Sequence, residues 1–377
     1  MPLQSDVAVF NNVGPNSISY SMTHASNPTP GQANVGAVQL LAARLTNDLT
    51  IVSNSAAASS FNYYGATVNG ISNTILSNES GKSLVLTSSG SGAARVSLSS
   101  NVDSVIQVNG SGNISILLPI TGIGSRLVLK GTGSGAMSLQ GANATYSGGT
   151  SIESNGTLLL QASGAAGTGV ISNAGTLRVG ADLSVTNQIN LTTESAVYQR
   201  DFGTGSAYNV FRVTGNLSEA ATTASILDGT ASGTKTLTGS FTSSSGATND
   251  AQRMGGIAQL SGGGGDIIVF QLSLTNLPSG SYLGWLDSGT WINATEGNSG
   301  TGLLALSNVQ GSYASSGASA TADYLGSWGY DAAQNSVWAI LDHEGSFAAI
   351  AVPEPNVMML FSAAVGFVLL RSRRRQR

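Results

Sequence analysis

The chain has 377 residues, of which 9% are charged, 41% are hydrophobic and 49 are glycine. This charge content is far below the ~25% of ordinary soluble domains, while the hydrophobic content is too high for a chain disordered by low hydrophobicity and high charge. The net charge is −4, but five of the fifteen basic residues lie at the C-terminus, so the rest has ten basic and nineteen acidic residues, a net −9 that excludes a basic nucleic-acid-binding surface.

Short apolar segments alternate with turns rich in Gly, Ser, Thr and Asn along most of the chain, which predicts an all-β protein. The chain has no cysteine, and this excludes disulfides, thiolate metal sites and cysteine nucleophiles. Residues 1–80 predict an irregular N-terminal β region or cap. Residues 1–30 contain neither a basic segment nor an apolar run of seven, so we expect a signal peptide to be encoded upstream of Met1.

Residues 81–196 contain short repeats. Leu-Val-Leu occurs at 84–86 and 127–129, and Gly-Ser-Gly occurs at 90–92, 110–112 and 133–135, at sequence spacings of 20 and 23. A repeat of about 20 residues is too small to bury its own apolar face and is typical of a solenoid. We therefore predict a right-handed parallel β-helix in which Leu86, Val108 and Leu129 are inward neighbours in successive coils.

The segment 144–180 is more specific. It contains Thr-Tyr-Ser-Gly-Gly-Thr at 145–150 and Gly-Thr-Leu at 156–158 and again at 175–177, a sequence spacing of 19. This pattern resembles the autotransporter-associated β-strand repeat. The resemblance implies a β-helical stalk of an exported bacterial surface protein.

Residues 197–350 are richer in aromatic side chains and predict a compact β-sandwich module. The apolar runs 266–274 and 336–341 predict central strands, while 243–250 and 261–265 predict loops. All four tryptophans lie in this module and fit either core packing, which we favour, or a platform on which sugars stack: Trp285, Trp291, Trp328 and Trp338.

Residues 351–377 combine three elements in a fixed order. The first is the motif Val352-Pro353-Glu354-Pro355. The second is an apolar run from Val357 to Leu370, which as a helix covers roughly 21 Å of a ~30 Å hydrocarbon core. The third is a basic tail that fits the positive-inside pattern and contains Arg371, Arg373, Arg374, Arg375 and Arg377.

This order resembles the PEP-CTERM sorting signal of Gram-negative bacteria, and 282–300 and 325–350 resemble a module that recurs just before that signal. The resemblance implies a single membrane-anchor helix and processing near the Pro-Glu-Pro motif by an exosortase-type enzyme of the inner membrane. The motif residues would then be recognised by the enzyme and would not themselves catalyse. A weak single-pass anchor without processing remains the simpler alternative.

An enzymatic β-helix requires clustered carboxylates together with Arg, Lys or His. Within 81–195 the acidic residues are single and scattered: Asp103, Glu153, Asp182 and Glu194. The only histidines are His24 and His343. Asp342-His343-Glu344 is the densest polar group, but on a strand His343 would face away from both acids, and a loop end is the better expectation. We predict no catalytic residue, no metal site and no cofactor.

These features predict an exported, non-enzymatic structural protein of the cell surface or extracellular matrix. Its expected partners are the sorting enzyme and the inner membrane, with an extracellular polysaccharide as a further candidate. The alternative is a carbohydrate-binding or polysaccharide-processing β-helix protein, for which a row of exposed Trp or Tyr would be the expected sign.

Overall fold

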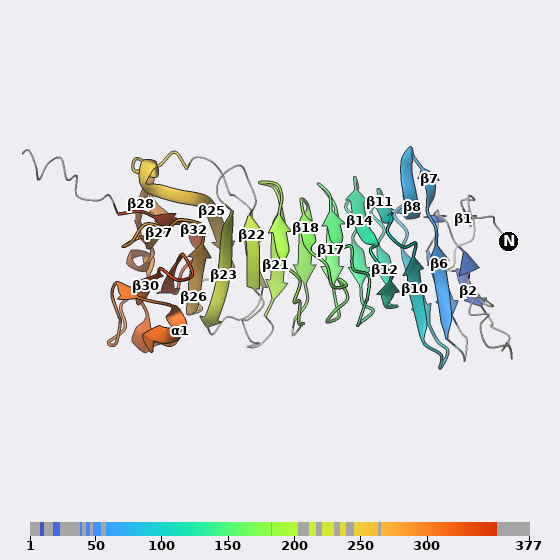
Figure 1. Cartoon of the computed structure of the whole chain (residues 1–377). Coiled ribbons are helices and arrows are strands. Elements are labelled where there is room, and N and C mark those ends of the chain that lie inside the picture. Colours follow the sequence, from blue (N-terminus) through green and yellow to red (C-terminus); the bar gives the residue numbers. More distant parts are fainter. Residues whose placement is uncertain are drawn as a thin grey trace, which may run out of the picture.

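The protein is all-β, and its strands are stacked into an elongated body (Figure 1). The computed structural model describes residues 8–10, 18–22, 38–39, 43–45, 48–53, 58–181, 183–202, 211–215, 221–229, 234–238, 245–262 and 265–352. The helical elements in these ranges are single turns: η1 (Asp250–Gln252), η2 (Ala294–Gly297), α1 (Tyr313–Ser316) and η3 (Ala322–Tyr324).

Two long ladders of parallel strands form the N-terminal portion of the body, and from Leu49 onward the chain passes from one ladder to the other in every coil. The first ladder consists of β2 (Ile18–Met22), β5 (Leu49–Ser53), β9 (Leu84–Ser88), β12 (Ile114–Ile116), β15 (Met137–Leu139), β17 (Thr157–Leu160), β19 (Thr176–Val179) and β21 (Val197–Asp201). The second ladder consists of β8 (Ile71–Asn78), β11 (Asp103–Val108), β14 (Arg126–Gly131), β16 (Thr150–Ile152), β18 (Ile171–Asn173), β20 (Ile189–Leu191) and β22 (Phe211–Gly215).

Shorter sheets accompany the ladders at the N-terminal end. A third parallel sheet contains β3 (Val38–Gln39), β6 (Ser59–Tyr63), β10 (Ala94–Leu98) and β13 (Ile120–Thr121). A parallel pair contains β1 (Ala8–Phe10) and β4 (Ala43–Leu45), while β7 (Ala66–Val68) forms a hairpin with β8. The third sheet ends at β13, so the described coils beyond it have strands in the two ladders alone.

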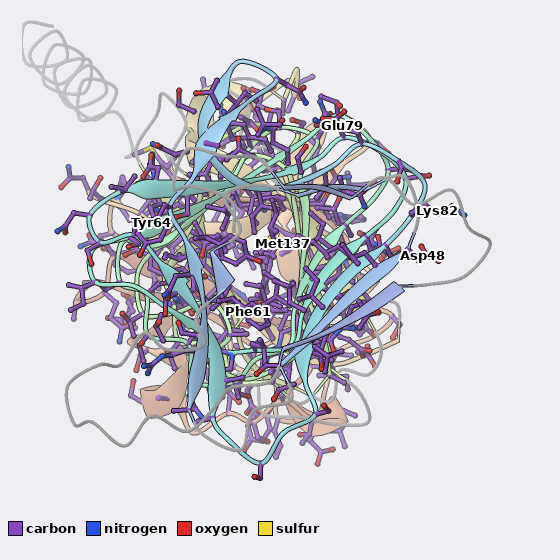
Figure 2. The ribbon with its side chains drawn as sticks, turned by 90° about the vertical axis from the view of Figure 1, so that its right-hand side faces the viewer. Asp48, Phe61, Tyr64, Glu79, Lys82 and Met137 are labelled. Atoms are coloured by element: carbon purple, nitrogen blue, oxygen red, sulfur yellow. The ribbon has the colours of Figure 1, made fainter. Side chains whose placement is uncertain are left out.

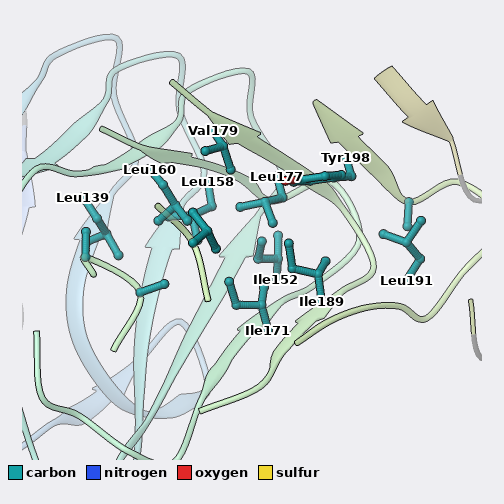
Figure 3. Packing of buried hydrophobic residues seen from close by; sticks show 14 of the residues in the cluster. Leu139, Ile152, Leu158, Leu160, Ile171, Leu177, Val179, Ile189, Leu191 and Tyr198 are labelled. Atoms are coloured by element: carbon teal, nitrogen blue, oxygen red, sulfur yellow. The ribbon is translucent and has the colours of Figure 1, made fainter. Parts of the chain in front are cut away.

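The core is a column of apolar side chains between the ladders. Alternate strand residues point inward because successive β-carbons leave opposite faces of a strand. In β17 and β19, for example, Leu158, Leu160, Leu177 and Val179 are buried while their neighbours face outward. Figure 3 shows these side chains meeting the isoleucines of the second ladder, and Figure 2 shows the column end on. One continuous apolar cluster runs from Leu49 to Ala349.

The coil length decreases along the stack, as the register of the first ladder shows. Leu49 pairs with Leu84, Leu84 with Ile114, and Ile114 with Met137, which gives coil lengths of 35, 30 and 23. The next steps, Met137 to Leu158 and Leu158 to Leu177, give coil lengths of 21 and 19. The sequence spacing of the two Gly-Thr-Leu segments is therefore confirmed as one coil. The coil length then returns to 21 at the step from Leu177 to Tyr198, so most of the shortening occurs in the coils that still contain strands of the third sheet.

The expected equivalence of 84–86 with 127–129 is wrong, because these segments lie in different ladders. Leu86 is paired with Ile116 of the first ladder, whereas Leu129 is paired with Ile106 of the second. Both leucines and Val108 are buried as expected, but Val108 is paired with Gly131 and is not a ladder neighbour of either. The two Leu-Val-Leu segments have the same sequence but lie on opposite sides of one core.

Two Gly-Ser-Gly turns lie at the same corner of successive coils, between the second and first ladders. A β-carbon on Gly133 would lie 2.1 Å from the carbonyl oxygen of Gly110, and one on Gly110 would lie 2.0 Å from that of Ser80. The corners thus stack backbone on backbone, which only glycine allows. The third turn, at 90–92, follows β9 and occupies another corner, so its distance along the chain from the turn at 110–112 is not a coil length.

Both ladders continue beyond the parallel coils as strands whose pairing is antiparallel, apart from one short parallel pair at the end of the second ladder. The first ladder is extended, in spatial order, by β24 (Thr234–Thr238), β25 (Arg253–Ser261), β32 (Gly345–Ile350), β27 (Tyr282–Asp287) and β28 (Thr290–Asn293). The second is extended by β23 (Thr222–Gly229), β26 (Ile268–Ser273), β31 (Ser336–Leu341), β30 (Trp328–Asp331) and β29 (Val309–Gln310). The predicted strands at 266–274 and 336–341 are confirmed as β26 and β31, in the interior of their sheet. Positions 81 and 197 are where the sequence analysis places the starts of the repeat region and of the C-terminal module. Strand pairing continues across both positions.

Candidate functional site

The predicted sorting motif begins where the described structure ends. Strand β32 ends at Ile350, and the amide of Ala351 donates to the carbonyl of Gln252 at 2.8 Å. Val352 follows with 48% of its surface exposed. The rest of the predicted signal lies outside the described residues: Pro353, Glu354, Pro355, the run Val357–Leu370 and the five terminal arginines. No helix within the described ranges is both long and apolar enough to cross a membrane.

The acidic residues of the coils are used in contacts between neighbouring coils. Asp103 accepts a hydrogen bond from Nε of Arg126 at 3.0 Å, and both oxygens of Glu153 lie 2.8 Å from Nζ of Lys130. Each pair joins adjacent strands on the outer face of the second ladder, with the same sequence separation of 23. Two of the four scattered acids are thus structural ion pairs, a use that this shared separation could have indicated. Asp182, like His24, lies outside the described residues.

Asp342, His343 and Glu344 lie in the loop between β31 and β32, as expected, and each is bonded to a different segment. The carboxylate of Asp342 accepts from the amide of Ser299 at 3.0 Å, and that of Glu344 accepts from the amide of Gly262 at 2.7 Å. These contacts hold surrounding loops to one turn. The three side chains do not converge on a common point at which a substrate or metal could bind.

The His343 ring is enclosed by backbone carbonyls and aromatic rings. Nε2 lies 2.8 Å from the carbonyl oxygen of Ala294, and Nδ1 lies 3.1 Å from that of Glu344. The ring packs edge-on against Trp285, with centroids 4.9 Å apart, and against Phe347 at 5.5 Å. Both ring nitrogens therefore contact the backbone, and among the described side chains neither is paired with an acid as in a catalytic pair.

The four tryptophans are packed against the protein. Trp291 and Trp338 are buried, and their indole nitrogens donate to Asp250 at 3.0 Å and to the carbonyl of Gly311 at 3.0 Å. Trp285 and Trp328 are partly buried against the main core. The described aromatic side chains thus provide no tryptophan row for sugar stacking, and core packing is their observed role.

A surface hollow, which sequence analysis missed, lies at the carboxyl ends of β17, β19 and β21. Its volume is about 280 Å³, near the lower end of the range for small-ligand sites. Outward residues of these strands line it in two rows. Leu159, Arg178 and Gln199 are paired in register and form the first row.

The second row lies two residues further along the same strands, where Gln161, Gly180 and Asp201 line the hollow. Thr234 of β24 pairs with Asp201 and closes one side. Since Gly180 has no side chain, the space between Gln161 and Asp201 stays open. The hollow therefore offers a guanidinium, two amides, a carboxylate and a hydroxyl around a small apolar surface.

The two arginines of β19 and β21 differ in direction and in partners. Arg178 is exposed and forms no salt bridge with any residue of the described ranges. Arg200 points to the opposite, inward face of β21 and is only 2% exposed. Its Nη2 donates to the carbonyl of Leu183 at 2.6 Å, while Nε and Nη1 have no hydrogen-bond partner among the described residues. Arg178 therefore lines the hollow, whereas Arg200 lies on the other face of β21.

Other candidate chemistry is missing from the stretches of chain that the structure describes. They contain no group of three or more His, Asp or Glu side chains arranged to hold a metal ion. Comparison with known proteins gave no match to any family model, curated protein or solved structure.

Proposed function

We propose that the chain is an exported, non-enzymatic structural protein of the cell surface or extracellular matrix, sorted through its C-terminal Pro-Glu-Pro motif by an exosortase-type enzyme. In this proposal the stacked coils are a right-handed parallel β-helix of the autotransporter-associated type. A β-sandwich-like module follows them, and a single anchor helix between Val357 and Leu370 holds the chain in the inner membrane before processing.

The observation that carries the proposal is the continuity of the two ladders. Thirteen strands in each sheet extend one core from the first coils to β32, and the motif begins two residues after β32. Such a rod places its N-terminal coils far from the point of attachment, which suits a spacer or matrix element. Neutral outer rows of Ser, Thr and Gln fit a surface exposed to water without strong electrostatic partners.

The non-enzymatic character is supported by the use of the polar groups that catalysis would need. Asp103, Glu153, Asp342 and Glu344 are bonded to other regions of the fold, and His343 contacts two carbonyls. A fragment that ends at Ala351, before the sorting motif, should cause neither hydrolysis nor β-elimination in a panel of plant and algal polysaccharides, with or without Ca²⁺. Turnover that disappears in His343→Ala would contradict this.

Sorting is tested by mass spectrometry of the C-terminus in a host that has the processing enzyme. We expect the wild-type chain to lose Arg377, and the double variant Pro353→Ala, Pro355→Ala to insert in the membrane but keep it. Replacing Arg373, Arg374 and Arg375 with Ser should instead weaken the membrane orientation, because positive charge retains the cytoplasmic end. Retention of Arg377 in both the wild type and the double-proline variant would mean that the C-terminal segment is a membrane anchor and not a sorting signal.

The second candidate is a carbohydrate-binding protein on the same scaffold. The hollow beside Arg178 favours it, since planar polar side chains around a small apolar surface suit a sugar. The tryptophan positions do not favour it. The two candidates are compatible, because a matrix protein can bind the polysaccharide that surrounds it.

A further inference from the structure

The hollow at the ends of β17, β19 and β21 is not required by the stacking of the coils. The corner glycines 110 and 133 are enforced by backbone atoms at 2.0 and 2.1 Å from their missing β-carbons. At Gly180 a β-carbon would come no closer than 3.5 Å to the Leu160 carbonyl oxygen and the Leu183 side chain, and the backbone is not in the left-handed region. A larger residue would fit the fold at this position, and it would fill the hollow.

Among the described residues, the hollow is lined by one cationic side chain, that of Arg178. Four other cations of the described chain are neutralised by carboxylates: Arg126, Lys130, Lys235 and Arg253. Arg178 has no such partner within the described ranges and lines the hollow directly. Arg200 points to the opposite face of the sheet and does not line the hollow. The guanidinium of Arg178 is therefore the group that the hollow presents to an anion.

We infer that this hollow binds a carboxylate-bearing sugar unit of an acidic polysaccharide. The guanidinium of Arg178 donates two parallel hydrogen bonds to the carboxylate of the sugar, the geometry in which arginine binds such groups best. Gln161 accepts a hydrogen bond from Ser138 and Gln199 donates one to Thr236, so the amide nitrogen of Gln161 and the amide oxygen of Gln199 bind sugar hydroxyls. Leu159 contacts the apolar face of the ring. The inference deepens the proposed function and rests on it, since it specifies the chemistry of the proposed polysaccharide partner.

The test is affinity electrophoresis of the full chain in mild detergent through gels that contain polygalacturonate or its methyl ester. The two polymers differ in the charge of the carboxyl group. We expect polygalacturonate to retard the wild type with an apparent Kd at least tenfold lower than that of the ester. Arg178→Ala should raise the Kd for polygalacturonate at least tenfold, and Gly180→Leu should do the same by filling the space.

Two control variants separate site binding from general effects. Arg95→Ala removes an exposed cation of β10, a strand of the third sheet, and should change the Kd less than twofold. Gly180→Ala should melt at the temperature of the wild type, which shows that the position tolerates a side chain. The inference is overturned if the wild type is not retarded, if the ester binds equally well, or if Arg95→Ala weakens binding as much as Arg178→Ala.

Failure of this inference is distinguishable from failure of the proposed function. If the chain loses Arg377 in the sorting host but does not bind polygalacturonate, the proposed function stands and the sugar site is refuted. A chain that binds polygalacturonate through Arg178 but keeps Arg377 leaves the sugar site and removes the sorting.

Discussion

Replacing Leu129 with aspartate tests the inward register of the second ladder. Leu129 is 1% exposed and is paired with Ile106 in the coil before it and Ile152 in the coil after it. Removing a buried leucine side chain costs about 2–5 kcal/mol. The aspartate adds about 1–3 kcal/mol, because its carboxyl group finds no hydrogen-bond partner among these side chains. We expect a total loss of roughly 5 kcal/mol, a large part of the ~5–15 kcal/mol that stabilises a folded domain.

Thermal unfolding of the full chain, followed by circular dichroism in mild detergent, measures this loss. With an unfolding entropy of about 2.1 cal/mol/K per residue, a chain of 377 residues shifts its melting temperature by roughly 1.3 °C per kcal/mol, so Leu129→Asp should melt about 6 °C below the wild type. The matched control is Ser151→Asp, which introduces the same group on the outward face of the next coil, where Ser151 is paired with Val128. Its cost should stay within about 1 kcal/mol. Equal melting temperatures for the two variants would refute the inward placement of Leu129.

Three further predictions concern other contacts. Burial alone would raise the pKa of Asp250, but hydrogen bonds from Ser245, Trp291 and Arg253 lower it to about 2. The ionised carboxylate should therefore add about 2 kcal/mol to the free energy of unfolding above pH ~4, and this contribution should be lost as the pH falls toward 2. Urea unfolding at pH 5 and pH 2.5 measures this, and the free energies of unfolding of the wild type and Asp250→Asn should differ less at pH 2.5. An equal difference at both pH values would contradict the prediction. Gly133→Ala should lower the free energy of unfolding by several kcal/mol in the same urea assay, because its β-carbon would lie 2.1 Å from a backbone oxygen. A free energy of unfolding equal to that of the wild type would rule out stacked corners. A double-mutant cycle of Lys130→Ala and Glu153→Ala should give a coupling within about 1 kcal/mol that falls in 1 M salt, since both side chains are partly exposed; coupling insensitive to salt would mean that the contact is not mainly ionic.

Local sequence patterns predicted the fold where one motif recurs at the same place in successive coils or where an apolar run is a single strand. The repeated Gly-Thr-Leu fixed the pairing of Thr157 with Thr176, and the apolar run 336–341 matched β31 residue for residue. The pattern failed where one motif occurs at two different places in the coils. Leu-Val-Leu occurs in both ladders because both line one apolar column, so identity of sequence did not mean identity of position. Only the pairing register separates Leu86 from Leu129.

The candidate site was missed for a related reason. Arg178 and Gly180 look unremarkable in sequence, and a hollow arises only when their neighbours in adjacent coils are known. The spacing of the Gly-Thr-Leu segments already aligns Leu159 with Arg178 and would have placed Gly180 beside Gln161. Asp342, His343 and Glu344 attracted attention because they are adjacent in sequence. Adjacent loop residues often point apart, and in this loop they bind three different segments.

The antiparallel strands explain how a parallel stack can end without an open edge of full length. A ladder that stopped at β21 or β22 would expose unpaired amides and carbonyls along a whole coil, which invites pairing with another chain. Here both ladders pass into antiparallel strands and finish at β28 and β29, which are four and two residues long. Short edge strands offer few backbone groups for pairing. The C-terminal strands therefore share the core of the coils and also protect their end.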